Sequence, residues 1–176
     1  QGEIDFSEAR FVALDEWIGL PDETENCTHF LKKHLYGPLG IAAENMELFD
    51  LTTDDLTKEC RRIDEFIFAK GGIDLMILGI GMNGHLGLNE PGDSFDSYTK
   101  VVELSETTMK VGQKYFSKPT RLKKGITLGV RHIFETNKVI LQISGKGKQE
   151  ITDRMYRMQP SEQLPASVMV LLKNGL

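Results

Sequence analysis

The sequence predicts an α/β fold built on a mainly parallel sheet with crossover helices. Short apolar runs typical of buried strands alternate with segments whose apolar residues recur at helical spacing. The chain has 176 residues, of which 40% are hydrophobic and 27% charged, so it can bury the core of one domain. Ligands of such folds bind beyond the carboxyl ends of the strands. The residues that follow each strand are therefore the first candidates for a functional site.

The first half of the chain contains two expected strands and two expected helices. Residues 10–15 (RFVALD) form a short apolar run and predict a strand. Residues 26–36 predict a helix, because their apolar side chains fall on one side. Residues 54–70 predict a second helix, opened by capping residues and closed by two glycines. Residues 74–80 (DLMILGI) are continuously apolar, as expected of a strand covered on both faces.

The second half continues the alternation. Three further short apolar runs predict strands at residues 101–104, 125–130 and 138–144. A helix is expected over residues 149–157, after a turn rich in glycine and lysine. A last apolar run at residues 166–172 predicts the final strand.

The charge distribution bears on the kind of ligand. The net charge is −5, which argues against nucleic-acid binding. From Lys110 to Lys148, however, the sequence contains ten Lys or Arg residues and a single acid, Glu135. Such a local basic field can attract an anionic small molecule. The same stretch could also be a solvated basic face without a ligand.

Other sequence features favour a cytoplasmic protein. No apolar run approaches the roughly 20 residues of a membrane span, and the first residues lack the pattern of a signal peptide. Two cysteines give no disulfide framework, and the Cys27, His29 and His34 pattern is better explained by chance than by a metal site. We therefore expect no membrane partner and no metal, and a homo-oligomer stays open.

The loop at residues 79–92 (GIGMNGHLGLNEPG) is rich in groups that do chemistry. Its glycines match the dinucleotide-binding spacing, but the NEPG sequence at its end would break the helix that such a site requires. The glycines then let the backbone approach another ligand closely. His85 and Glu90, with Asn83 beside them, are suited to proton transfer near neutral pH. The alternative is an ordinary loop histidine with Glu90 as a cap.

Two other strand ends are also candidates. Asp15 and Glu16 end the first expected strand and could supply a carboxylate base, or Asp15 could cap a following short helix. Residues 144–150 (SGKGKQE) place small residues and lysines at a helix start, which is a suitable phosphate cradle although it lacks the P-loop spacing. A flexible basic turn is the alternative there.

These motifs together resemble the glucosamine-6-phosphate deaminase/isomerase family. The similar segments are residues 14–21 (LDEWIGLP), 78–92, 125–129 (GITLG) and 145–148 (GKGK), in the family's order and across nearly the whole chain. The branch known as galactosamine-6-phosphate isomerase/deaminase is the most similar, because it shares the run from Lys70 to Gly92 and the later GKQ and PAS sequences. The resemblance implies one domain over residues 1–176, with a three-layer, Rossmann-like α/β fold.

The resemblance also implies a role for each candidate. Asp15 would be the base that moves a proton between C2 and C1 of the opened sugar, and His85 would open the ring as acid and base. Glu90 would orient His85, with Asn83 beside the ring. Substrate-binding positions would be Glu16, Gly79, Gly81, Gly84, Lys114 and Lys148, the two lysines holding the phosphate. The implied substrate is a hexosamine 6-phosphate, most closely galactosamine 6-phosphate converted to tagatose 6-phosphate and ammonia, without a metal or organic cofactor.

The chain departs from the family pattern at several places, among them Asp93 and Val102, where a serine and a lysine of allosteric glucosamine-type enzymes would be expected. Asn83 stands where some members have an aspartate, so His85 should be held less strongly as a cation. Lys114 replaces a common arginine, which changes the geometry of phosphate binding. The family's N-terminal strand and phosphate loop are missing from these 176 residues, so we expect an unfinished sheet and an incomplete phosphate site.

Three alternative functions remain at this point. Glucosamine-6-phosphate deamination differs only in the epimer. A 6-phosphogluconolactonase-like hydrolase shares the fold, but its histidine is typically followed by a TASLFP sequence, whereas residues 86–91 here are LGLNEP. A non-catalytic sugar-phosphate sensor would need phosphate ligands but not the proton-transferring set of Asp15, His85 and Glu90.

Overall fold

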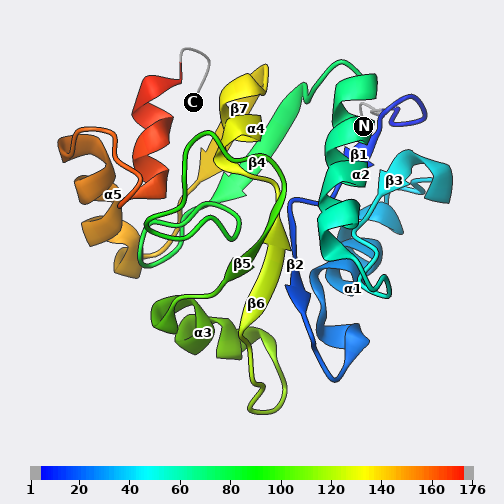
Figure 1. Cartoon of the computed structure of the whole chain (residues 1–176), viewed down its shortest axis with the longest axis horizontal. Coiled ribbons are helices and arrows are strands. Elements are labelled where there is room, and N and C mark those ends of the chain that lie inside the picture. Colours follow the sequence, from blue (N-terminus) through cyan, green and yellow to red (C-terminus); the bar gives the residue numbers. More distant parts are fainter. Residues whose placement is uncertain (1–4, 173–176) are drawn as a thin grey trace.

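The computed structural model describes residues 5–172, and it confirms the α/β class, with helices on two sides of the strands (Figure 1). The strands are β1 (Phe11–Val12), β2 (Asp15–Ile18), β3 (Met46–Glu47), β4 (Leu75–Gly79), β5 (Lys100–Glu103), β6 (Lys124–Thr127) and β7 (Lys138–Gln142). The α-helices are α1 (Cys27–Leu31), α2 (Leu56–Ala69), α3 (Glu106–Gly112), α4 (Val130–Glu135) and α5 (Gln149–Arg157). None of the helices in this part of the chain is long and apolar enough to cross a membrane.

Strand pairing is parallel in two places and antiparallel in a third. β4 pairs with β7 in parallel from Leu75↔Lys138 to Gly79↔Gln142, and β1 pairs with β3 in parallel. β6 lies between β2 and β5 and is antiparallel to both. The sequence predicted a mainly parallel sheet, but it predicted neither the strand β3 nor this antiparallel unit, which brings Asp15 opposite Thr127.

The expected helices are confirmed, and α2 shows why. Asp55 caps its first turn by accepting a hydrogen bond from the backbone N–H of Lys58 at 2.9 Å. Gly71 and Gly72 then end it with positive φ angles of 85° and 101°, which L side chains rarely adopt. The expected helix at residues 26–36 forms as α1 followed by a π-helical turn, and α5 has the expected bounds.

Two strand predictions need correction. Residues 166–172 do not form a strand: Pro165–Leu171 is a 3₁₀ helix with a proline in its first turn. A short apolar run has no periodicity that separates a buried strand from a buried helical turn, and proline suits a helix start. The expected strand at 10–15 is split, so Asp15 is the first residue of β2 instead of the last residue of its predecessor.

β4 is not covered on both faces by the described residues. Met76 and Leu78 are buried in the main core, whereas Leu75 and Ile77 are 50% and 59% exposed. The continuous apolar run predicted burial of both sets. Along a strand, alternate side chains point to opposite faces, so one face of β4 packs on the core and the other faces outward.

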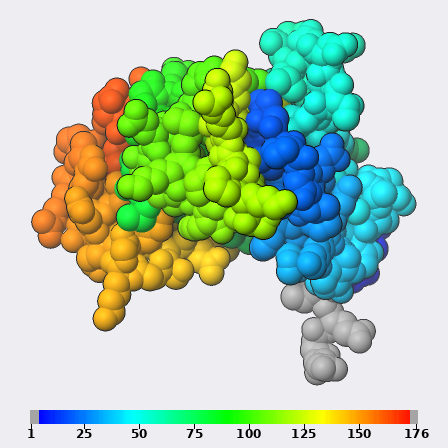
Figure 2. Space-filling model, turned by 90° about the horizontal axis from the view of Figure 1, so that it is seen from below, coloured from blue at the N-terminus to red at the C-terminus, as the bar shows by residue number. Residues whose placement is uncertain are grey.

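The main core joins the strands to the helices and supports the segment after β4. Buried residues of α2, β4, β6, β7, α5 and the C-terminal 3₁₀ helix form one continuous cluster: Ile63, Ile67, Met76, Leu78, Leu86, Ile126, Val139, Ile151, Met155, Leu164 and Val168 are among its members. Figure 2 shows the middle of the chain, in green, lying between the C-terminal part in orange and the N-terminal part in blue. The loop after β4 contacts segments from both halves of the chain, because the N–H of Ala166 donates to the carbonyl of Gly84 and Gly87 lies against Asp15.

Gly84→Ala should destabilise the fold. Gly84 has a φ of +87°, and a Cβ atom there would lie 2.3 Å from Cδ1 of the fully buried Leu164. Strain and overpacking together should lower the free energy of unfolding by about 2–4 kcal/mol, measured from urea unfolding curves. Gly79→Ala is the control, because its Cβ would meet nothing within 4 Å. Equal unfolding midpoints for the two variants would contradict the prediction.

Candidate active site

The loop after β4 turns back on itself and does not continue into a helix. The N–H of Gly81 donates to the carbonyl of His85 at 2.9 Å, and Ile80 and Leu86 form an isolated bridge. The carboxamide of Asn89, which is fully buried, donates to the carbonyls of Leu86 and Leu128 at 2.9 Å each. Dinucleotide-binding sites need a helix directly after the third glycine, and the described chain has none there.

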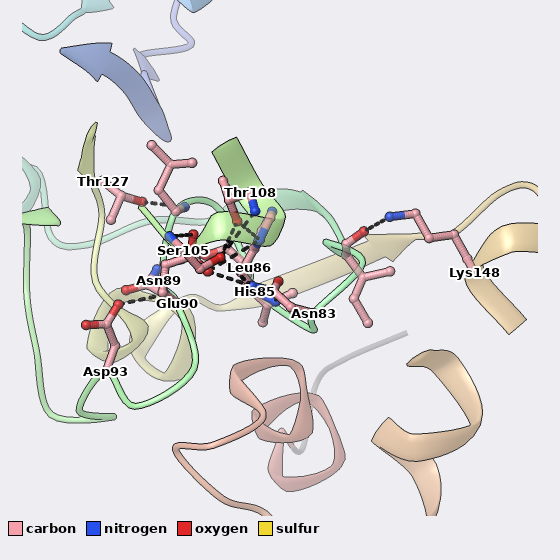
Figure 3. A network of polar contacts seen from close by, with 12 residues as sticks. Asn83, His85, Leu86, Asn89, Glu90, Asp93, Ser105, Thr108, Thr127 and Lys148 are labelled. Carbon is pink, nitrogen blue, oxygen red and sulfur yellow. Dashed lines mark hydrogen bonds and ion pairs between the residues drawn. The ribbon is translucent and has the colours of Figure 1, made fainter. Parts of the chain in front are cut away.

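The fold places the ring of His85 at the centre of a polar cluster (Figure 3). The ring lies against the backbone of Gly81, where a Cβ atom would be 2.3 Å from Cε1 of His85. Its Nδ1 is 3.0 Å from the hydroxyl of Thr108 and 3.9 Å from Oε2 of Glu90. Thr108 is therefore the direct hydrogen-bond partner of the ring, and Glu90 acts on it through charge.

Glu90 is buried, and both oxygens of its carboxylate accept hydrogen bonds. Its Oε2 accepts from the carboxamide of Asn83 at 2.7 Å, and its Oε1 accepts from the backbone N–H of Ser105 at 3.1 Å. Asn83 also donates to the hydroxyl of Ser105 at 2.9 Å and accepts from the N–H of His85 at 3.2 Å. The predicted grouping of Asn83, His85 and Glu90 is thus present in the structure.

Burial dominates the acid–base behaviour of His85. Desolvation lowers the pKa of His85 below its ordinary value, and the positive charge of Lys148 adds to this effect, whereas the negative charge of Glu90 opposes it. The ring is consequently neutral at pH 7 and is able to accept a proton.

Asp15 approaches the same loop from β2. Gly87, with a φ of +60°, leaves room for it: a Cβ atom on Gly87 would lie 3.4 Å from Oδ2 of Asp15. Burial and, to a smaller extent, the negative charge of Glu16 raise the pKa of Asp15 to about 6, against the opposing effect of a hydrogen bond from the Cys27 thiol. The thiol lies 3.6 Å from Oδ1. Asp15 is therefore a stronger base than an exposed aspartate, yet it is mostly ionised at pH 7.

Glu16 has a structural role. It is 1% exposed, and its carboxylate accepts from the backbone N–H groups of Trp17, Cys27 and Thr28 at 2.8–2.9 Å. These contacts fix the start of α1 against β2. An acid does serve a helix start, as one sequence alternative proposed, but it is Glu16 instead of Asp15. Contact between Glu16 and a substrate stays a prediction.

The two predicted phosphate ligands are electrostatically coupled. The ammonium group of Lys148 donates to the carbonyl of Ile80 at 2.5 Å, which directs it to the end of β4 (Figure 3). Desolvation and the positive charge of Lys114 both lower the pKa of Lys148. The ammonium nitrogen of Lys114 itself lies 4.8 Å from the centre of the Tyr115 ring. Two cations that repel each other in this way favour an anion between them.

Two of the three loop glycines predicted to bind a ligand are needed for the packing of the chain itself. Gly81 makes room for His85, and Gly84 makes room for Leu164, whereas a Cβ on Gly79 would meet nothing. Their predicted contacts with a ligand stay predictions. Within residues 5–172, no group of three or more His, Cys, Asp and Glu side chains is placed to hold a metal ion.

Comparison with known proteins decides the family. Residues 1–175 match the model of the family described as glucosamine-6-phosphate isomerases/6-phosphogluconolactonase. The chain belongs to this family. A glucosamine-6-phosphate deaminase of Thermoanaerobacter sp. (strain X514) is 39% identical over 97% of this chain and 68% of its own length. A protein of Escherichia coli (strain K12) that is named as a deaminase, AgaI, is 38% identical over 99% of this chain and 69% of its own length.

Solved structures of family members agree with the fold. A monomeric glucosamine-6-phosphate deaminase has a TM-score of 0.92 and 34% identity over 97% of this chain and 72% of that chain. A 6-phosphogluconolactonase from Thermotoga maritima has a TM-score of 0.74 at 21% identity over 94% of this chain and 69% of that chain, which supports the fold alone. The expected family and its Rossmann-like fold are therefore confirmed.

Three residues of the site lie outside the motifs that indicate this family. Thr108 and Ser105 contact His85 and Asn83, and Cys27 contacts Asp15. Ser105 is the N-cap of α3, and the sequence SETT at residues 105–108 carries a recognisable capping signal. Nothing in that signal indicates that the helix starts against a histidine 20 residues earlier, because the contact depends on the fold.

Cys27 variants should move the pKa of Asp15 in opposite directions. Cys27→Ser supplies a stronger donor to the carboxylate and should lower the pKa by about one pH unit, and Cys27→Ala removes the donor and should raise it. The measurement is the NMR titration of the Asp15 carboxyl carbon. Cys60→Ser, which changes the other cysteine, is the control. Identical titration curves for both Cys27 variants would disprove the assigned contact.

Proposed function

We propose that this chain catalyses the isomerisation and deamination of a hexosamine 6-phosphate, with galactosamine 6-phosphate giving tagatose 6-phosphate and ammonia. The observation that carries the proposal is the meeting of a carboxylate base, Asp15, and a neutral histidine, His85, at one loop, with two lysines nearby. Aldose–ketose isomerisation needs a base for carbon and a second proton shuttle. The proposal treats residues 1–176 as one catalytic domain.

The phosphate would bind first, between Lys148 and Lys114. The repulsion that lowers the pKa of Lys148 would be relieved by a dianion between the two ammonium groups. Lys148 sits just before α5, so backbone N–H groups of the first turn can add to the binding. Phosphate binding would fix the sugar with its carbon chain directed towards the loop after β4.

His85 would then open the sugar ring. A neutral imidazole can donate the proton of one ring nitrogen to the ring oxygen as the C1–O5 bond breaks, while its other nitrogen takes up the proton released from the anomeric hydroxyl. The partial burial of His85, whose side chain is 18% exposed, limits competition from water. Glu90, 3.9 Å from Nδ1, would stabilise the transient positive charge on the ring.

Asp15 would carry out the carbon chemistry. It takes the C2 proton to give an enolamine and returns a proton to C1, which leaves a C=N bond at C2. Water then adds to this carbon and ammonia leaves, so that the ketose 6-phosphate is formed with atoms in balance. A base with a pKa of about 6 is better suited to this step than an ordinary aspartate.

Two observations bear on the choice of epimer. The sequence from Lys70 to Gly92 resembles the galactosamine-6-phosphate branch and supports the substrate proposed here. The names of relatives that are 39% identical support glucosamine 6-phosphate as the second candidate.

A direct substrate comparison tests the proposal. The chain should release ammonia and form a ketose phosphate from galactosamine 6-phosphate, with a higher kcat/KM than from glucosamine 6-phosphate. Coupled ammonia and ketose assays measure both products, and 6-phosphogluconolactone is the third substrate. Preference for glucosamine 6-phosphate would overturn the epimer, and lactone hydrolysis without ammonia release would overturn the whole proposal.

The pH profile should report on Asp15. Below a pH of about 6 Asp15 is protonated and cannot act as a base, so kcat/KM should fall about tenfold per pH unit. Asp15→Asn should lower kcat by about 10²-fold or more and remove the contribution of Asp15 to this acid limb, leaving only that of His85, while sugar-phosphate binding, measured by calorimetry, is retained. An unchanged kcat in Asp15→Asn would exclude Asp15 as the base.

A further inference from the structure

We propose that Thr108 is a positioning residue for His85, and that its hydroxyl holds the ring in the tautomer with the proton on Nε2. The hydroxyl lies 3.0 Å from Nδ1, and Thr108 is only 3% exposed, so water does not compete for this contact. The effect on catalysis rests on the function proposed above, whereas the tautomer follows from the hydrogen bonds alone.

The direction of these hydrogen bonds follows from counting protons at Ser105. Its hydroxyl oxygen accepts from the carboxamide of Asn83 at 2.9 Å and from the backbone N–H of Thr108 at 3.2 Å. Both lone pairs are then in use, and the hydroxyl proton must be donated. The acceptor is the hydroxyl oxygen of Thr108, at 3.1 Å.

Thr108 in turn must pass its own proton on. Its oxygen already accepts from Ser105, and its hydroxyl proton is directed to Nδ1 of His85. A neutral imidazole that accepts at Nδ1 carries its proton on Nε2. The chain of donors runs from Asn83 through Ser105 and Thr108 to the ring, and all four residues are drawn in Figure 3.

Glu90 cannot set the tautomer in the same way. Its Oε2 is 3.9 Å from Nδ1, which is beyond hydrogen-bond distance. Both of its oxygens already accept from other groups, Asn83 and the N–H of Ser105. Glu90 therefore acts on the ring of His85 through its negative charge, and Thr108 determines the tautomer through its hydrogen bond.

A hydroxyl partner suits a histidine that gains and loses a proton. When Nδ1 becomes protonated, the Thr108 hydroxyl can rotate and accept from it, because one of its lone pairs is still free. A carboxylate in that position would accept only, and would hold the ring as a cation. The arrangement therefore keeps His85 in place in both protonation states without favouring the charged one.

The first test uses the unaltered chain and needs no substrate. Long-range ¹H–¹⁵N spectra at about pH 8, where a free histidine is neutral, distinguish the two tautomers. The His85 signals are assigned by their loss in His85→Gln. We expect His85 as the Nε2–H tautomer, and an Nδ1–H tautomer would overturn the proposal whatever the substrate is.

Three variants form the second test. Thr108→Val keeps the shape but removes the hydroxyl, and should give a mixture of tautomers and a kcat about tenfold lower with KM changed by less than about twofold. Thr108→Ser should restore both the single tautomer and most of kcat. Thr107→Val removes the neighbouring exposed hydroxyl and should match the unaltered chain in both measurements.

The outcomes separate this proposal from the proposed function. A Thr108→Val chain with an unchanged tautomer and unchanged kcat would disprove the positioning role. If no hexosamine 6-phosphate is turned over by any chain, the function fails, while the tautomer measurements still decide the role of Thr108. Loss of kcat in Thr108→Ser equal to that in Thr108→Val would indicate that the methyl group, and not the hydroxyl, is what His85 requires.

Discussion

The buried carboxamide of Asn89 is the contact on which the arrangement of the site depends. It joins the loop after β4 to the end of β6 by donating to the carbonyls of Leu86 and Leu128. Each of these carbonyls also has a second donor, the backbone N–H of Asn89 for Leu86 at 3.0 Å and the hydroxyl of Thr127 for Leu128 at 3.1 Å, so four hydrogen bonds hold this buried turn. The loop therefore turns back at this point instead of entering a helix. This turn brings His85 and Glu90 to the start of α3, and it brings Gly87 against Asp15.

Burial acts in opposite directions on the two groups proposed to move protons. It raises the pKa of Asp15 and lowers that of His85, because in both cases the interior disfavours the charged form. The pKa of Asp15 thereby moves towards neutrality, which suits a base that exchanges a proton with carbon, whereas the pKa of His85 moves below its ordinary value, which keeps the ring neutral. Neither shift requires a special partner. Removal from water is the first cause of both, and the neighbouring charges of Glu16, Glu90 and Lys148 adjust the result.

Local patterns predicted α1, α2, α5 and β4 because the signals for these elements lie within single segments of the sequence. α2 has its cap, its apolar spacing and its glycine stop within a single segment, and β4 has a continuous apolar run. In the antiparallel unit, β2 pairs with β6 although their residues lie more than 100 positions apart, so no local pattern reveals this pairing. The grouping of Asn83, His85 and Glu90 was predictable since one loop holds all three, whereas Thr108 reaches His85 only through the fold.

Asp15 and Glu16 are adjacent in β2, and they have different roles because the start of α1 lies against Glu16. Glu16 accepts from the backbone N–H of Cys27, and this contact places the Cys27 thiol on the carboxylate of Asp15. Glu16 thus affects the pKa of Asp15 in two opposed ways: its charge raises it, and the thiol that it positions lowers it. Removing the charge of Glu16 would therefore not simply remove one of these effects. It would also release the helix start that supplies the thiol, so the base strength of Asp15 depends on how firmly α1 is attached to β2.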